Sequence, residues 1–238
     1  MHCYKLIRSN RKTIQIQILP DKTIEVRAPK KVSDKRINSF VTSKEKWINT
    51  KIEEKKEIAQ IPVKHFYVVG ETFYYRGKQY VLKSCDESVK KSSVYLSGNN
   101  LIIQTRLKTP EAFKNTFVRW QKERACEVFN ELFEECWIHF KNYYPKYEKP
   151  NLSLRTMKTR WGSLSQNTNF RPASMTLNTL LVCSNNNCIK QVIYHELCHL
   201  IHPNHGKGFY ETFEFFVPDW RILKKELECL FLKSSAML

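Results

Sequence analysis

A pair of histidines four residues apart constrains this chain more than any other feature. The segment His195-Glu196-Leu197-Cys198-His199 has the pattern H-E-x-x-H, and His205 follows six residues later. On an α-helix, side chains four residues apart project from one face, so the two histidines would point the same way. Glu196 would lie beside them, within reach of a metal-bound water without being a ligand. The spacing therefore predicts a helix that holds zinc through His195 and His199, with Glu196 as general base.

The residues around the pair favour a partly buried helix. Ser184 or Asn185 can cap its N-terminus. An apolar stripe follows at helical spacing and comprises Ile189, Val192, Ile193 and Leu200. Burying two imidazoles and a carboxylate without partners costs several kcal/mol, roughly, and a bound metal with its water would remove that cost. We expect Cys198 to be a small apolar helix residue and not an additional ligand.

Spacing alone constrains the third ligand less. Pro203 removes a helical hydrogen bond and disfavours helical geometry at the residue before it, so the chain should turn near Ile201 or His202. That turn would bring His205 back to the metal, and His205 is our predicted third ligand. The residues also leave three alternatives, which are His202, Glu211 and Glu214.

The spacing of apolar and turn-forming residues divides the rest of the chain into strands and helices. It predicts a β-hairpin over 4–28, a helix over 33–60, strands over 65–108 with turns at 76–78 and 98–100, a long helix from Pro110, short strands over 152–182, and helical segments over 207–232 broken at Pro218. We therefore expect an α+β protein. Its N-terminal β-rich subdomain, with one helix, would span residues 1–108, and the catalytic subdomain residues 109–238.

Charge and cysteine usage bound the partners and the compartment. The chain has 40 Lys and Arg against 23 Asp and Glu, and this excess could attract nucleic acid, although no nucleic-acid motif is present and a solvated basic surface fits equally well. No apolar run reaches the length of a membrane span, so we expect no membrane partner. Because the eight cysteines show no C-x-x-C pair and no signal-peptide core precedes them, we expect reduced thiols and a cytoplasmic protein.

Three blocks of the sequence resemble one known family. The first is the H-E-x-x-H segment with Asn204-His205-Gly206 and Phe209, the second is Met157-Lys158-Thr159-Arg160-Trp161-Gly162-Ser163 with Leu177-Asn178, and the third is Arg8-Ser9-Asn10-Arg11-Lys12-Thr13 with Val26-Arg27-Ala28-Pro29 and Trp47-Ile48. Together they resemble the YgjP-like metal-dependent hydrolases, which are zincin-like proteins related to the SprT-like and WLM peptidases. The resemblance implies a zincin-like catalytic domain, zinc bound by His195, His199 and His205, and Glu196 as general base. The chain departs from the family at Leu164, where cysteine is usual, and at Cys198, where a small residue is usual.

The second block suggests where substrate would bind. In zincin-like folds a strand beside the metal helix borders the cleft and can pair with an extended peptide. Arg160, Trp161 and Asn178 are therefore candidate substrate-binding residues, and the alternative is that they are structural, with Trp161 in the core.

Three functions are compatible with these residues. The first is a zinc metallopeptidase, in which Glu196 assists attack by zinc-bound water on a peptide carbonyl. The second is a metal-dependent pyrophosphatase acting on a nucleoside triphosphate such as UTP, with the phosphates held by Arg155, Lys158 and Arg160. The third is a basic nucleic-acid-associated module with a structural metal. Only three ligands are evident, which favours catalysis, because structural zinc sites usually have four protein ligands.

Overall fold

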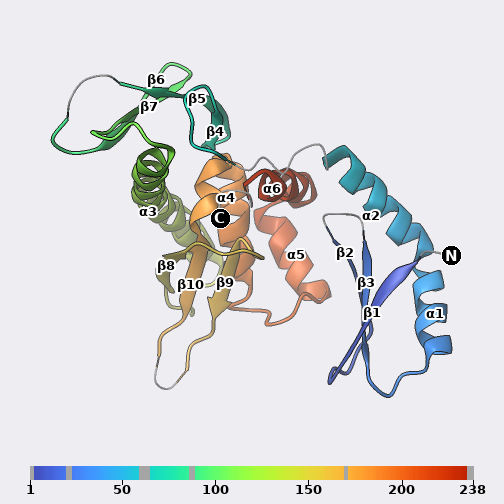
Figure 1. Ribbon diagram of the computed structural model, residues 1–238. Coiled ribbons are helices and arrows are strands. Elements are labelled where there is room, and N and C mark those ends of the chain that lie inside the picture. The colour runs from blue at the N-terminus through green and yellow to red at the C-terminus, as the bar shows by residue number, and fades with distance from the viewer. Residues whose placement is uncertain (1–2, 20–22, 59–64, 86–88, 169–170, 235–238) are drawn as a thin grey trace. The chain divides into compact units, whose positions relative to one another are not determined.

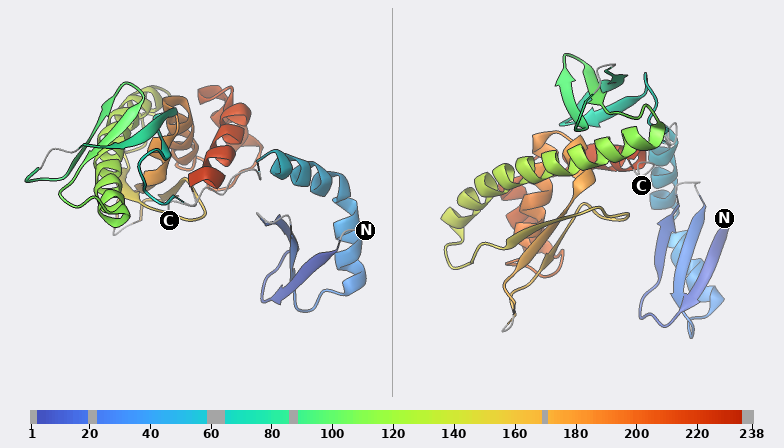
Figure 2. Two further views of the ribbon diagram at one scale, coloured as in Figure 1. Left: turned by 45° about the horizontal axis from the view of Figure 1, so that its top comes forward. Right: turned by 60° about the vertical axis from the view of Figure 1, so that its left-hand side comes forward.

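The computed structural model describes residues 3–19, 23–58, 65–85, 89–168 and 171–234, and it divides the chain into two compact units. The units are Met1–Pro62 and Val63–Leu238. The described part contains three small sheets and six α-helices, so the protein is of mixed α+β type (Figures 1 and 2). No helix in this part of the chain is long and apolar enough to cross a membrane.

The N-terminal unit is a three-stranded sheet with two helices. Strands β1 (Tyr4–Ser9), β2 (Gln15–Ile18) and β3 (Ile24–Pro29) have the order β1-β3-β2, and helices α1 (Asp34–Ser43) and α2 (Glu45–Ile58) follow. The predicted hairpin is the antiparallel pair β2–β3, and β1 adds a strand parallel to β3. Residues 20–22, between the two strands of this hairpin, lie outside the described residues. The predicted helix over 33–60 is two helices, because α1 ends at Lys44, whose amide bonds back to Val41 O.

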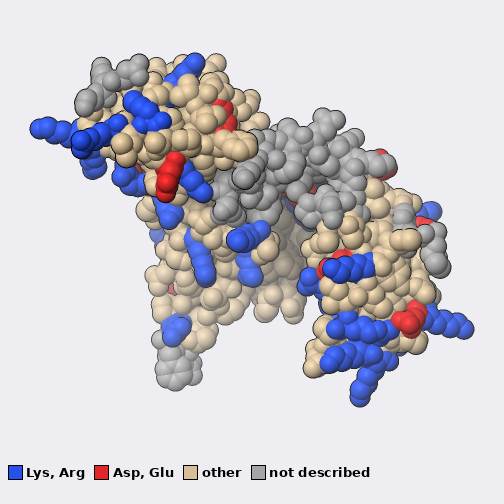
Figure 3. Space-filling view, viewed as in Figure 1, with Lys and Arg blue, Asp and Glu red and all other residues tan. Residues whose placement is uncertain are grey.

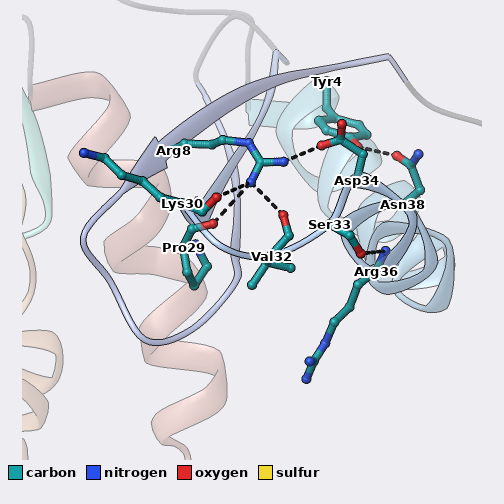
Figure 4. A network of polar contacts seen from close by, with 9 residues as sticks. All are labelled: Tyr4, Arg8, Pro29, Lys30, Val32, Ser33, Asp34, Arg36 and Asn38. Carbon is teal, nitrogen blue, oxygen red and sulfur yellow. Dashed lines mark hydrogen bonds and ion pairs between the residues drawn. The ribbon is translucent and has the colours of Figure 1, made fainter.

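One arginine fixes the connection between β3 and α1. Figure 4 shows the Arg8 guanidinium donating to the carbonyls of Pro29, Lys30 and Val32, at 3.3, 3.2 and 2.7 Å. The same side chain pairs with Asp34 in the first turn of α1. Three carbonyls of an irregular segment thus have a charged donor, which holds that segment in one conformation.

The C-terminal unit begins with a sheet that packs on a long helix. Strands β4 (Thr72–Tyr75), β5 (Lys78–Ser84), β6 (Ser93–Ser97) and β7 (Asn100–Gln104) have the order β4-β5-β7-β6, and helix α3 spans Pro110–Tyr143. The turns predicted at 76–78 and 98–100 connect β4 to β5 and β6 to β7. The sheet and α3 share one core, which includes Phe73, Leu82, Leu101, Phe117 and Trp120. For this reason the compact units divide between residues 62 and 63, a different place from the predicted boundary between residues 108 and 109.

The rest of the C-terminal unit surrounds one helix. Strands β8 (Asn151–Arg155), β9 (Gly162–Ser165) and β10 (Ser174–Asn178) form a sheet of order β8-β10-β9, and the short 3-10 helix η1 covers Thr179–Cys183. Helices α4 (Asn186–Cys198), α5 (Lys207–Phe216) and α6 (Trp220–Ser234) complete the unit. Helix α4 packs against α3, α5, α6 and β9, so elements that precede it and elements that follow it in the sequence cover it. The H-E-x-x-H segment lies at the C-terminal end of α4.

Basic side chains are spread over both units. On the face drawn in Figure 3, Lys and Arg outnumber Asp and Glu on each of them. In the N-terminal unit four exposed cations follow β3 closely, and these are Lys30, Lys31, Lys35 and Arg36. The nucleic-acid partner expected from the net charge stays a prediction, because charge alone does not select one polyanion.

Candidate metal centre

Three histidines converge at the end of α4. His195 lies in the last turn of the helix, His199 caps it, and His205 comes from the turn that leads to α5. One ring nitrogen from each lies within 4.8 Å of the others, and the Nε2 atoms of His195 and His205 are 3.0 Å apart. Within the described residues this is the one group of three or more His, Cys, Asp or Glu side chains that could hold a metal ion.

The turn after α4 brings His205 to the other two rings. The helix loses its regular bonding after Cys198, and the amides of Leu200 and Ile201 bond to carbonyls three residues back. The chain then reverses through Pro203 before α5 begins at Lys207. The reversal is the one that Pro203 predicts, because proline cannot continue the helical ladder.

Phe209 of α5 lies against all three imidazoles. Its ring centroid is 5.0 Å from that of His195, 4.9 Å from that of His199 and 4.6 Å from that of His205. Phe209 is 1% exposed, so it provides a buried apolar surface in contact with the cluster. The sequence predicts that Phe209 lies on a helical segment covering the metal helix, and the structure adds its contact with all three rings.

The protonation of the rings suits metal binding. His199 donates from Nδ1 to the carbonyl of His202 at 3.0 Å, which leaves its Nε2 lone pair for a metal. Burial, with smaller contributions from His199, His205 and Lys224, lowers the pKa of His195 to about 4. The pKa of His205 is also lowered, first by burial. Neutral imidazoles are the form that binds metal, so the cluster is prepared for a cation.

The three alternative ligands have other partners. The Nε2 atom of His202 lies 3.1 Å from the Thr212 hydroxyl. Glu211 faces Lys207 at 3.6 Å on the exposed side of α5. Glu214 accepts a hydrogen bond from the Trp220 indole and pairs with an arginine of α6. None of the three belongs to the histidine cluster of the described chain.

Glu196 is buried beside the cluster. It is 5% exposed, and burial raises its pKa to about 7 against the opposing charge of Arg160. Gly162, the first residue of β9, passes so close that a Cβ there would lie 2.7 Å from Glu196 Oε1 and 2.9 Å from its Cγ. The absence of a side chain at Gly162 therefore allows β9 to approach the carboxylate, a role that spacing in the sequence does not reveal.

Asn178 holds the segment that precedes β9. The residue is fully buried, and its side-chain amide donates to the carbonyls of Met157 and Arg160, at 2.8 and 2.9 Å. Its side-chain oxygen accepts from the amides of Met157 and Leu180. Because these bonds occupy the whole side chain, Asn178 holds residues 157–160 in place from the protein interior.

Arg160 is exposed, and Trp161 is half-buried against the surrounding core.

Cys198 stands apart from the cluster although it lies between two of its histidines in sequence. The side chain is fully buried, and burial raises the pKa of its thiol to about 12. A protonated, apolar thiol packs as a small core residue, as the sequence predicted.

The residues present fit a bound divalent metal. Zinc bonded to nitrogen at about 2.0–2.1 Å in tetrahedral geometry requires ligand atoms about 3.3 Å apart. The separation of 3.0 Å between His195 and His205 is close to that value, and all three donors are imidazole nitrogens. His205 is exposed and His195 and His199 are partly exposed, so solvent can reach the cluster.

Comparison with known proteins identifies the family. No curated protein matches the chain. A family model described as YgjP-like, metallopeptidase domain, matches residues 12–229. The chain therefore belongs to the YgjP-like metallopeptidase family, whose members are metal-dependent hydrolases.

Proposed function

We propose that this member of the YgjP-like family is a zinc-dependent peptidase with its active site at the end of α4. His195, His199 and His205 would hold the metal, and Glu196 would act as general base. One observation carries the proposal, namely three imidazole nitrogens within 4.8 Å of one another beside a carboxylate that is 5% exposed. Three protein ligands are typical of catalytic zinc sites, which keep one position for water.

In this proposal Glu196 moves the proton. A metal bound by the three histidines would polarise the substrate carbonyl and lower the pKa of water. The Glu196 carboxylate would take a proton from the attacking water and deliver it to the nitrogen of the departing peptide. Gly162 of β9 lies close to the carboxylate and limits its movement, which is what a positioned base requires.

The second wall of the site would bind the peptide backbone. Strand β9 is at the edge of its sheet and, in the described part of the chain, pairs with β10 alone. An extended peptide can add to such an edge by main-chain hydrogen bonds. We propose that Arg160 and Trp161 border this edge of the sheet and that Asn178 positions them. Arg160, whose charge acts on Glu196, would also stabilise negative charge that develops on the carbonyl oxygen.

The test is hydrolysis of a mixture of unstructured peptides by the full chain with zinc. We expect cleavage by the wild type and a loss of about 10²–10⁴-fold in Glu196→Gln, the range for a general base. The variant should retain its zinc, because Glu196 is not a ligand. Equal turnover by the two proteins would exclude the general-base role.

The same preparations separate peptidase from pyrophosphatase activity. Nucleoside triphosphates such as UTP are offered in parallel, and release of pyrophosphate is measured. Hydrolysis of triphosphate that depends on Glu196, without cleavage of any peptide, would overturn the peptidase proposal while keeping the metal centre.

A further inference from the structure

An aromatic platform adjoins the candidate metal centre. The Trp220 ring, at the start of α6, stacks on Tyr210 with centroids 5.4 Å apart, and Tyr210 is 6.3 Å from the ring of His205. Trp220 also contacts Phe213, which in turn packs on His195 at 5.3 Å. Two chains of ring contacts thus connect Trp220 to two of the proposed metal ligands. Tyr210 is 38% exposed, so the platform reaches solvent beside the centre.

Two cations lie over this platform, and they differ in their partners. The Arg221 guanidinium is 4.6 Å from the Trp220 ring and forms an ion pair with Glu214 at 2.5 Å. The Lys224 ammonium is 6.0 Å from the same ring, and within the described chain no acidic side chain pairs with it. Lys224 therefore carries a positive charge that no acidic side chain of the described chain neutralises. It lies over a ring that adjoins the candidate metal centre.

We infer that Lys224, with the rings of Tyr210 and Trp220, forms a subsite for an acidic side chain of a peptide bound at the metal centre. The inference rests on the proposed peptidase function. The ammonium is a compact charge that suits a carboxylate, and the two rings provide an apolar surface for the methylene groups of Glu or Asp. A basic side chain in the same place would be repelled by Lys224 and by a metal cation. An uncharged one would lose the attraction to both.

Paired peptides that differ only by Glu against Gln test this preference. Each pair carries the change at one position on either side of a cleaved bond, and kcat/KM is measured with the zinc-loaded full chain. We expect one position at which the Glu peptide is favoured about fivefold, the size of effect that an exposed ion pair gives. The preference should fall as salt is raised, because the charges are solvent-accessible.

Substitutions on α6 locate the subsite. Lys224→Met should abolish the preference, and Lys224→Glu should reverse it. Lys225→Glu is the matched control, because Lys225 is also exposed but lies about 100° further around the helix. The inference is wrong if the wild type shows no charge preference, or if Lys225→Glu changes it as much as Lys224→Glu does.

Binding to the Glu196→Gln variant separates this inference from the proposed function. If the wild type cleaves no peptide, the peptidase proposal fails. The affinities of that variant for the Glu and Gln peptides, measured by fluorescence titration, still test whether the subsite exists. Tighter binding of the Glu peptide that Lys224→Met removes would support the subsite, and equal binding of both peptides would overturn it.

Discussion

The two walls of the candidate site are built in different ways. The α4 wall takes His195, His199 and Glu196 from five consecutive residues of one helix, where the helical repeat sets their directions. The opposite wall, residues 157–162, has no regular structure before β9 and is fastened by the buried amide of Asn178, which lies 18–21 residues away in sequence. The first wall depends on local geometry. The second depends on contacts that exist only once β10 has formed.

This difference indicates where the site is sensitive to change. A helix backbone bonds to itself, so substitution of one surface residue of α4 should leave the directions of the others intact. The 157–162 segment relies on a few side-chain bonds and on a close approach at Gly162, so single substitutions there should move several groups together. The following predictions test that contrast, from the largest expected effect to the smallest.

Gly162→Ala should lower kcat/KM by about 10²-fold, which is the cost of displacing a catalytic group by about 1 Å. The new methyl group would lie 2.7 Å from Glu196 Oε1, and the carboxylate would have to turn away. Because Glu196 is buried and its Cγ would also lie 2.9 Å from the new methyl group, the free energy of unfolding should fall as well. Peptide hydrolysis and urea denaturation of the same preparation measure both quantities.

Gly206→Ala is the matched control for this change. A Cβ at Gly206 meets no atom within 4 Å, and the residue has a negative φ of −81°. The control should keep wild-type turnover. Similar activity in the two variants would show that β9 does not confine Glu196.

Asn178→Ala should lower the free energy of unfolding by about 2 kcal/mol, because buried backbone groups lose their hydrogen-bond partners. Guanidinium denaturation with an unchanged m-value measures the loss. Asn178→Asp keeps the bonds accepted from Met157 and Leu180 but places a buried carboxylate oxygen against the carbonyls of Met157 and Arg160, so its loss should be at least as large as that of the alanine variant. A stability equal to the wild type in Asn178→Ala would contradict the fastening role.

Asn185→Ala should cost about 1 kcal/mol of stability and leave turnover per folded molecule unchanged. Asn185 is the N-cap of α4, and its side-chain oxygen accepts from the amide of Cys188 at 2.9 Å. The cap is at the end of the helix remote from the histidines. Loss of hydrogen bonds in the first turn should therefore leave the positions of the histidines unchanged. A drop in kcat/KM as large as that of Gly162→Ala would mean that the two walls respond alike.

The same contrast explains what could be predicted from the sequence. The helix that carries His195 and His199, its cap at Asn185 and the turn after it follow from local rules of spacing, capping and proline geometry. The approach of Gly162 to Glu196 and the contact of Phe209 with the three histidines depend on which elements pack together. Local rules of spacing do not predict which elements pack together. Asn178 was a candidate substrate-binding residue with a structural role as the alternative, and its position at the end of β10 depends on pairing with β8 and β9, a contact between distant segments.

The larger organisation shows the same limit. Alternating isoleucines predicted the β2–β3 hairpin, whereas the parallel pairing of β1 with β3 depends on residues about 20 apart in sequence. The sheet β4–β7 reads as part of a β-rich N-terminal region, yet Phe73 and Leu82 pack with Phe117 of α3. Apolar periodicity tells which face of a strand is buried, and it does not tell which helix covers that face.

The most direct measurement is the zinc affinity of the full chain and of two histidine variants. His205→Ala removes a proposed ligand, and His202→Ala removes a neighbouring histidine that faces Thr212. We predict one zinc per wild-type chain, an affinity at least about 10²-fold weaker in His205→Ala, and a smaller change in His202→Ala, whose ring is not a ligand. Equal affinities in the wild type and His205→Ala would contradict the three-histidine centre.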